Sequence, residues 1–242
     1  MRESGRLVAR VLAAIAAAAK PGVKPVELDR LAAGMLHEAG AVSSFRGYHP
    51  VWAPRPYPAV VCLSVNDAIV HGIPDARPLR DGDLLSVDFG AAIDGLHADA
   101  ATTVAIGQVD PRDEALIAAT ERALQAGIAA SRPGARTGDI GAAIEAVGRG
   151  AGLGIVEGLG GHGIGDEMHE DPSVPNVGRP RTGVRLQPGL AIAIEPMFTR
   201  GAGRHRTLGD GWTIVTADKS RAAHAEHTIV ITHDGPEVLT LP

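Results

Sequence analysis

The feature of this sequence that most constrains its fold is an internal repeat with a fixed offset. The segment Pro21-Gly-Val-Lys-Pro-Val-Glu-Leu28, ending at Ala39-Gly40, recurs as Pro133-Gly-Ala-Arg-Thr-Gly-Asp-Ile140, ending at Ala151-Gly152, and every matched position is displaced by the same amount. A helix-like stretch precedes each Pro-Gly, and β-rich segments follow each closing glycine. A short match of this kind can arise by chance, but the shared offset at both ends argues against that. The sequence therefore predicts two related halves, each running helix, helix, strands.

The halves, about 1–110 and 111–242, should form a single α+β domain spanning 1–242. If their strands merge into one sheet with the helices on its outer face, the inner face becomes a pseudo-symmetric cavity. We therefore expect the chemistry of the protein to converge on that inner face.

Composition narrows the class of function. The chain has 242 residues, 45% of them hydrophobic, and a formal net charge of −5 with no Lys/Arg-rich run, so neither DNA nor a membrane surface is an expected partner. The apolar stretch Leu12–Ala19 is too short to span a bilayer and is interpreted as a helix. Cys62 is the only cysteine, which fits a reducing, cytoplasmic location and leaves metal chemistry to His, Asp and Glu.

Two dipeptides typical of tight turns predict β-hairpins. Asp94-Gly95 lies between strand-like residues 84–89 and 97–104, and Asn66-Asp67 lies between residues 60–64 and 68–71. Three further segments have strand character: Ile192–Glu195, Trp212–Val215 and His227–Thr232.

The first hairpin brings two carboxylates together. It places Asp99 opposite Gly90, two residues from Asp88, so Asp88 and Asp99 become diagonal neighbours on one face, about 7–8 Å apart at Cα. For an arbitrary pair of aspartates, one would cap a turn and the other would face solvent. Here Asp88 lies in the apolar run 84–89, where a buried carboxylate needs a partner or a metal ion.

Other metal-type side chains occupy comparable positions. Glu195 ends the run Ala191-Ile-Ala-Ile, Glu226 adjoins an apolar strand, and His162 lies in a glycine-rich loop. Four carboxylates could share two cations, and an imidazole favours transition metals over calcium. A paired site of this kind can activate water and polarise a carbonyl. His71 would face Cys62 across the Asn66-Asp67 turn, although a lone histidine there is more often structural.

Taken in order, the motifs resemble the bacterial-type (type I) methionine aminopeptidases over essentially the whole chain. The likeness is carried by Tyr57-Pro-Ala-Val-Val-Cys, Val70-His-Gly-Ile-Pro, Val87-Asp, His97-Ala-Asp, Gly161-His-Gly-Ile-Gly, Met168-His-Glu-Asp-Pro, Ile194-Glu-Pro-Met and Ala225-Glu-His-Thr. The resemblance implies the pita-bread fold, in which a curved antiparallel sheet carries helices on its outer face. It also implies removal of the N-terminal initiator methionine by two-metal hydrolysis, with a small second residue preferred.

The resemblance further assigns roles to residues of this chain. It implies that Asp88 chelates one metal ion, that Asp99 and Glu226 bridge both ions, and that His162 and Glu195 complete the second. Glu195 would also shuttle a proton, His169 would steady the developing oxyanion, and His71 would contact the scissile amide. The methionine pocket would be formed by Tyr57, Cys62, Trp212 and Tyr48. The two divalent ions could be Co, Mn, Fe, Ni or Zn, since this ligand set selects no single one.

The sequence departs from the family pattern in two places, and two other functions stay open. The stretch between Tyr48 and Tyr57 is longer than expected and proline-rich, and Met168 replaces a frequent aromatic residue. A prolidase or Xaa-Pro aminopeptidase would use the same ligands, but those relatives usually carry an extra N-terminal domain. A non-catalytic pita-bread binding protein would be expected to lose ligands.

The resemblance also sets expectations about partners. The substrates would be methionine-initiated peptides and nascent chains. With no zinc-finger or SH3-binding extension in the sequence, any docking to the ribosome would use the catalytic domain itself. We expect a monomer.

Overall fold

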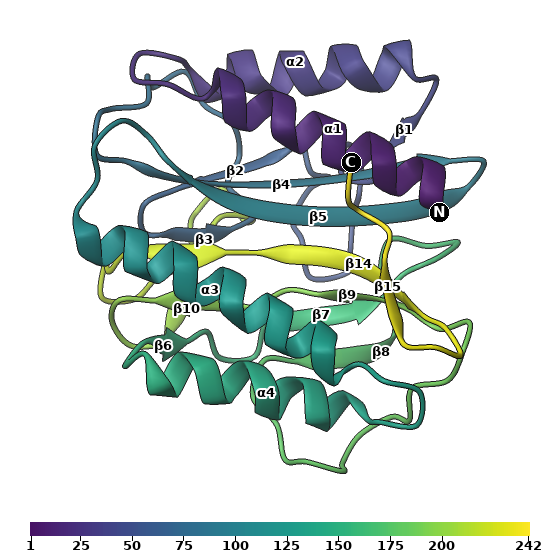
Figure 1. Ribbon diagram of the computed structural model, residues 1–242. Helices are drawn as coiled ribbons and strands as arrows, with labels where there is room; N and C mark the ends of the chain where they lie inside the picture. The colour runs from purple at the N-terminus through teal and green to yellow at the C-terminus, as the bar shows by residue number, and fades with distance from the viewer.

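Four helices cover the outer face of a large antiparallel sheet. The computed structural model describes residues 1–242, and Figure 1 shows the helices in front of the strands. They are α1 (Arg2–Ala18), α2 (Pro25–Glu38), α3 (Pro111–Ala130) and α4 (Thr137–Gly150). The offset of the sequence repeat relates both ends of α2 to those of α4, and it also relates β1 (Val42–Ser43) to β6 (Gly154–Ile155). The repeat seen in the sequence is therefore a repeat of structure.

The second helix of each half begins with the same capping contact. The backbone N–H of Lys24 donates to the Glu27 carboxylate at 3.0 Å, and that of Arg136 donates to Asp139 at 2.8 Å. A carboxylate at the third helical position satisfies an otherwise unpaired backbone donor and complements the positive end of the helix dipole. This contact fixes the start of both helices.

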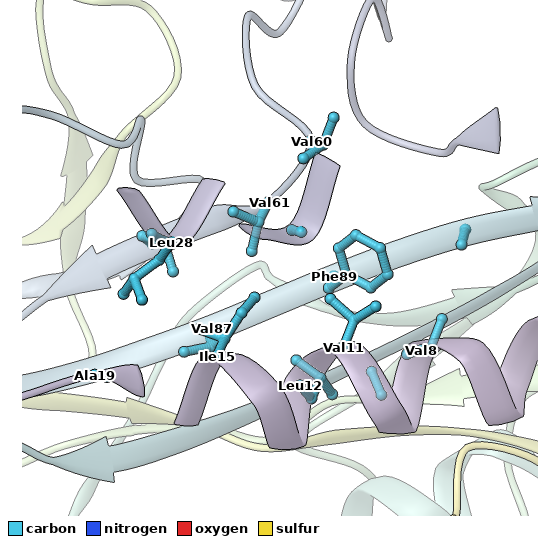
Figure 2. Packing of buried hydrophobic residues seen from close by; sticks show 14 of the residues in the cluster. Val8, Val11, Leu12, Ile15, Ala19, Leu28, Val60, Val61, Val87 and Phe89 are labelled. Carbon is cyan, nitrogen blue, oxygen red and sulfur yellow. The ribbon is translucent and has the colours of Figure 1, made fainter. Parts of the chain in front are cut away.

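Helix α1 packs one apolar stripe against the sheet. Val8, Val11 and Ile15 recur at helical spacing, have no exposed surface, and point in Figure 2 toward the strand that carries Val87 and Phe89. Each such side chain contributes about 1.5–3 kcal/mol through burial. In the second half of the chain, a separate cluster of buried apolar side chains joins α3 and α4 to the strands of that half. None of the four helices is long and apolar enough to cross a membrane.

The hairpin predicted at Asp94-Gly95 is confirmed. Strands β4 (Leu84–Ile93) and β5 (Leu96–Ala105) pair along their whole length, with Gly90 opposite Asp99. Both turn residues have positive φ, 52° at Asp94 and 79° at Gly95, as a two-residue turn that follows the strand twist requires. The two longest strands of the protein therefore carry two of the predicted metal ligands, Asp88 on β4 and Asp99 on β5.

Strand β14 (Glu226–Ile231) joins the two halves. It pairs with β5 of the first half and with β9 (Ala191–Ile194) of the second, all antiparallel. On one side, the sheet continues from β9 through β7 (Gly160–Gly163) to β8 (Glu170–Pro175). On the other side, β1 and β2 (Cys62–Val65) both pair with β4. The last strand, β15 (Pro236–Val238), pairs with β14. One nine-stranded antiparallel sheet thus spans both halves, which confirms the predicted fold class.

The hairpin predicted at Asn66-Asp67 is wrong. Strand β2 pairs with β4, whereas β3 (Ala68–Val70) leaves the large sheet and pairs with β12 (Ile214–Thr216). Leu63 N of β2 donates to Gly72 O, beyond the end of β3, at 2.8 Å. The turn is instead tied to β4, since the Asn66 side chain accepts from Leu84 N and donates to Asp83. These bonds hold the turn against a third strand and let β2 and β3 diverge.

Two small sheets complete the fold. One contains β6, β10 (Met197–Thr199) and β13 (Ala222–His224), and the other contains β3, β12 and β11 (His205–Thr207). The strand expected from Trp212 begins at Ile214, two residues later. Both small sheets extend the walls around the inner face of the large sheet.

Candidate functional site

A cavity of about 280 Å³ opens on the inner face of the sheet, opposite the helices. Its fourteen lining residues include all of the side chains singled out from the sequence: Tyr48, Tyr57, Cys62, His71, Asp88, Asp99, His162, His169, Glu195, Trp212 and Glu226. They come from both halves of the chain. One end of the cavity is acidic and the other is aromatic.

Strand register explains why the acidic residues meet. Cys62 pairs with Asp88, Asp88 pairs with Ala101, and Ala101 pairs with Glu226, so one row of side chains crosses four strands on the same face. Asp99 lies two residues before Ala101 and therefore projects from that face as well. Because Ala101 is small, the carboxylates around it share one space.

Glu195 extends this row into the second half. It directly follows Ile194, whose partner is His227, so continuing the register places Glu195 beside Glu226. The Asn176 side-chain amide donates to the Glu195 backbone carbonyl at 2.9 Å and holds the chain where β9 ends. Glu195 therefore reaches the cavity from just beyond a strand.

The ring of His162 is oriented for coordination. Its Nδ1 contacts the backbone oxygen of Gly163 at 2.8 Å, which favours the tautomer that carries the proton on Nδ1. Its Nε2 then has a free lone pair and lies 3.7 Å from Glu195 Oε1. A ring whose far nitrogen is hydrogen-bonded to the backbone is the usual arrangement for a metal-ligating histidine.

Thr228 holds Asp99 in place. Its hydroxyl accepts from Asp99 N at 2.9 Å and donates to Asp99 O at 2.7 Å, linking β14 to β5. This residue was not predicted from the sequence, although it lies on the same strand as Glu226. The backbone that carries the carboxylate is therefore fixed independently of any bound ion.

The buried carboxylates lack partners within the protein. One oxygen each of Asp88, Asp99 and Glu226 has no hydrogen-bond partner. Burial raises the pKa of Asp88 to about 7, and burial followed by repulsion from neighbouring carboxylates raises the pKa values of Asp99 and Glu226 well above their usual range. Unpaired buried charge is costly, so these residues fit a site that binds cations.

The ligand atoms form two overlapping groups. Asp99, His162 and Glu226 offer atoms within 4.8 Å of one another, and so do Glu195, His224 and Glu226. Asp88 belongs to neither group, but the register of β4 and β5 makes it a diagonal neighbour of Asp99 on the same face. Because Glu226 is common to both groups and Asp99 adjoins Asp88, the donors suffice for a pair of ions that share carboxylates.

His224 is a site residue that was not predicted from the sequence. Its ring is 1% exposed, and neither ring nitrogen has a hydrogen-bond partner. Nε2 lies 3.5 Å from Glu195 Oε2 and 3.9 Å from Glu226 Oε2. Burial alone would raise the pKa of Glu195, but contacts with His224 and other histidines outweigh it and leave that pKa below its usual value. His224 ends β13 and Glu226 begins β14, so no strand pattern in the sequence relates the two side chains.

Two further histidines flank the acidic end. His71 follows β3 with φ of 58°, and His169 precedes β8 with its ring centroid 4.1 Å from that of His162 and 5.2 Å from that of Tyr48. Burial lowers the pKa of each to about 4. Both rings are therefore neutral at pH 7 and able to donate a hydrogen bond without adding charge.

The other end of the cavity is an aromatic and sulfur-containing slot. The Tyr57 and Trp212 rings pack edge to face at 5.1 Å, and Cys62 and Met168 complete the wall. The Tyr57 hydroxyl donates to Gly72 O at 2.8 Å, which leaves the ring face toward the cavity. Phe45 and Trp52 also line the slot and were not predicted as site residues. Trp52 comes from the proline-rich stretch already noted in the sequence.

Buried carboxylates and a histidine on the inner face of a duplicated α+β fold define a metal-dependent hydrolase of the pita-bread type. A family model described as metallopeptidase family M24 matches residues 1–233, and the chain belongs to that family. Among curated proteins, methionine aminopeptidase 1 of Mycobacterium tuberculosis is 50% identical over 248 residues, covering 100% of this chain and 91% of that protein.

Solved structures show the same architecture. Methionine aminopeptidase from Thermotoga maritima superposes with a TM-score of 0.96 at 38% identity, covering 100% of this chain and 95% of that one. An Xaa-Pro dipeptidase from Bacillus anthracis shares the fold with a TM-score of 0.78 at 22% identity, and this chain spans 59% of it. The pita-bread fold expected from the sequence is therefore confirmed.

Proposed function

We propose that this protein is a methionine aminopeptidase, which removes the initiator methionine from nascent proteins and peptides when the second residue is small. One observation carries the proposal: five metal-type ligands and a slot lined by aromatic rings and sulfur share one cavity of about 280 Å³. That volume lies just below the ~300–1,000 Å³ typical of ligand pockets, which suits a site that binds one end of a peptide chain. The full-length similarity to methionine aminopeptidases supports the same conclusion.

We further propose that the site holds two divalent ions. Asp88 would contact one ion, Asp99 and Glu226 would contact both, and His162 and Glu195 would contact the other. When bound, such a pair supplies Lewis acidity toward the substrate carbonyl and lowers the pKa of water. The donors are carboxylates with one or two imidazoles, so Co, Mn, Fe, Ni and Zn all remain suitable.

The acid–base work would fall to Glu195. Its pKa lies below the usual value, so it is ionised at neutral pH and can accept a proton. His224, 3.5 Å from Glu195 Oε2, would hold the carboxylate in a fixed orientation. Glu195 could then pass the proton to the departing amine.

The neutral histidines would stabilise charge. His169, whose ring lies 4.1 Å from that of His162, would donate a hydrogen bond to the oxyanion that develops on the scissile carbonyl, and His71 would contact the scissile amide. Hydrogen-bond donors that are already in position stabilise the charge of the transition state most strongly where water is excluded. Both rings are neutral at pH 7 and therefore do not compete with cation binding.

The slot would hold the methionine side chain. Tyr57, Cys62 and Trp212 provide a flexible thioether with polarisable, apolar contacts, and Tyr48 lies at the rim against His169. The closed end of the slot limits the length of the first residue. Selection for methionine would therefore arise from shape and from the lack of polar partners.

We also propose how the chain is organised and where it acts. Residues 1–242 would form one catalytic domain and act as a monomer. If the protein docks to the ribosome, the catalytic domain itself would make the contact. The buried, unpaired Cys62 supports action in the reducing cytoplasm, where nascent chains emerge.

Two other functions are less well supported. A prolidase or Xaa-Pro aminopeptidase shares the fold, but the identity to such a structure is 22%, against 50% to a methionine aminopeptidase. A non-catalytic binding protein would have no reason to retain unpaired buried carboxylates in one cavity.

A substrate comparison tests the proposal. The metal-stripped protein is reconstituted anaerobically with manganese, cobalt or ferrous ion and assayed on Met-Ala-Ser, Met-Lys-Ser and Ala-Pro-Gly. We expect metal-dependent release of methionine from Met-Ala-Ser alone. Cleavage of Ala-Pro-Gly would instead identify a prolidase, and no turnover with any of the three metals would support a binding protein.

A further inference from the structure

The proline-rich segment between Tyr48 and Tyr57 forms a closed loop at the mouth of the cavity. Its two ends are joined by backbone hydrogen bonds of 2.9 Å, from Gly47 N to Tyr57 O and from Tyr57 N to Tyr48 O. Residues 49–56 therefore project as a compact loop with adjacent ends.

Further contacts hold this loop in one position. The Trp212 indole N–H donates to Arg55 O at 2.9 Å, and His49 Nε2 contacts Ala53 O at 3.1 Å. Pro54 packs so closely on Gly211 that a Cβ there would lie 2.3 Å from the Pro54 ring. The loop is thus anchored to the same tryptophan that lines the methionine slot.

Trp52 is the large side chain that this loop carries into the site. Its ring stacks on His71, with centroids 6.1 Å apart and planes 19° apart, and meets Trp212 edge to face at 5.0 Å. It is nevertheless 59% exposed, so one side of the indole faces the mouth of the cavity. An exposed tryptophan held rigidly beside a functional cavity is a common form of contact residue.

Trp52 also lines two cavities. Besides the cavity that contains the slot, it lines a neighbouring cavity of about 500 Å³ that shares His71, His162, His169 and Glu195 with the first and continues past Val70 and Ile214. If methionine occupies the slot, the neighbouring cavity offers the chain beyond the scissile bond a path past His71. The second residue of the substrate would then lie beside the Trp52 ring.

On the basis of the proposed aminopeptidase function, we propose that Trp52 is a specificity-determining residue that limits the size of the second residue of the substrate. The indole forms a wall over the position of that residue. Small side chains fit beneath the wall, whereas branched or longer side chains meet it. The loop of residues 49–56 thus adds a second selection to the one made by the methionine slot.

The test compares Trp52→Ala with the wild-type enzyme on Met-Ala-Ser, Met-Val-Ser and Met-Leu-Ser, measuring kcat/KM at one fixed metal concentration. The ratio of kcat/KM for Met-Leu-Ser to that for Met-Ala-Ser should rise about tenfold or more, since a difference of one methylene group in a pocket is worth about 10–200-fold and the leucine side chain is larger still. Trp52→Phe should retain most of the discrimination.

Val51 provides a matched control on the same loop. It is fully exposed and lines neither cavity, so Val51→Ala should leave the ratio unchanged. An unchanged ratio in Trp52→Ala, or an equal loss on all three peptides, would overturn the proposal. If the wild-type enzyme released no methionine from Met-Ala-Ser, the proposed function itself would fail, which is a separate outcome.

Discussion

The two halves of the chain have the same scaffold but contribute differently to the site. In both, a helix, a second helix with an acidic cap and a two-residue strand follow one another, and one constant offset relates the second helix and the strand of each half. After that strand the halves diverge. The first half continues into a hairpin of two ten-residue strands, whereas the second half uses strands of three to six residues.

The site residues belong to the parts that diverge. The constant offset ends at β1 and β6, because the strands that follow differ in number and length between the halves. The first half provides two carboxylates from one continuous hairpin, while the second provides His162, Glu195 and Glu226 from three separate segments. The repeat thus describes the helical cover, whereas the ligands come from strands to which its offset does not extend.

The largest expected effect comes from removing one ligand of each half. Asp88→Asn and Glu195→Gln should each lower kcat/KM for Met-Ala-Ser by at least about 10³-fold, through weaker metal binding or lost proton transfer. Glu114→Gln, on the exposed face of α3, makes the same chemical change away from the site and should have no effect. Substantial activity in either site variant would reject the assignment.

The flanking histidines should affect turnover more than metal binding. His71→Ala and His169→Ala should each lower kcat by about 10²–10³-fold, the range for losing one preplaced hydrogen-bond donor. Calorimetric titration with Mn²⁺ should give the wild-type stoichiometry for both variants. Loss of metal from His71→Ala would show that this residue is a ligand and not a substrate contact.

Without metal, the acidic end should make stability depend on pH. Because the pKa values of Asp88, Asp99 and Glu226 are raised in the folded protein, it holds protons that the unfolded chain releases. These bound protons stabilise the folded protein at lower pH, and the stabilisation is lost as pH rises through about 7 and above. Buried His71 and His169, with pKa values of about 4, act in the opposite direction, but only below about pH 6.5.

The measurement is therefore made between pH 6.5 and 8.5. The free energy of unfolding of the metal-free protein should fall by about 1.4 kcal/mol per pH unit for each carboxyl that stays protonated. Saturating Mn²⁺ should remove most of this dependence, because bound cations favour the charged carboxylates. A metal-free protein whose stability rises across this range would contradict the account of the acidic end.

The smallest effect tests the repeated scaffold. Glu27→Ala and Asp139→Ala remove the corresponding caps from α2 and α4, and Glu27→Ala should destabilise the protein by about 1 kcal/mol. For a chain of this size, that corresponds to about 2–4 °C in Tm, with kcat/KM unchanged. Asp139→Ala should lower Tm further, because Asp139 also accepts from Arg181 N at 2.7 Å, and a smaller shift than that of Glu27→Ala would contradict this.

The sequence predicted those features that depend on local pattern. The register of the Asp94-Gly95 hairpin and the ends of α2 and α4 follow from short motifs. Local pattern failed at Asn66-Asp67, where the turn is tied to Leu84, a residue 18 positions away. His224 and Thr228 were missed because their importance arises from contacts between strands that only the folded chain brings together. Trp52 was missed because a proline-rich loop gives no pattern that reveals where its side chain points.

Metal titration of the stripped protein shows whether the two halves jointly build a site for two metal ions. Isothermal calorimetry with Mn²⁺ under anaerobic conditions should show two ions bound per wild-type chain. Asp88→Asn should bind one, since Asp88 is assigned to a single ion and the His162, Glu195 and Glu226 set stays intact. Two ions retained in Asp88→Asn, or none bound by the wild-type protein, would contradict the account.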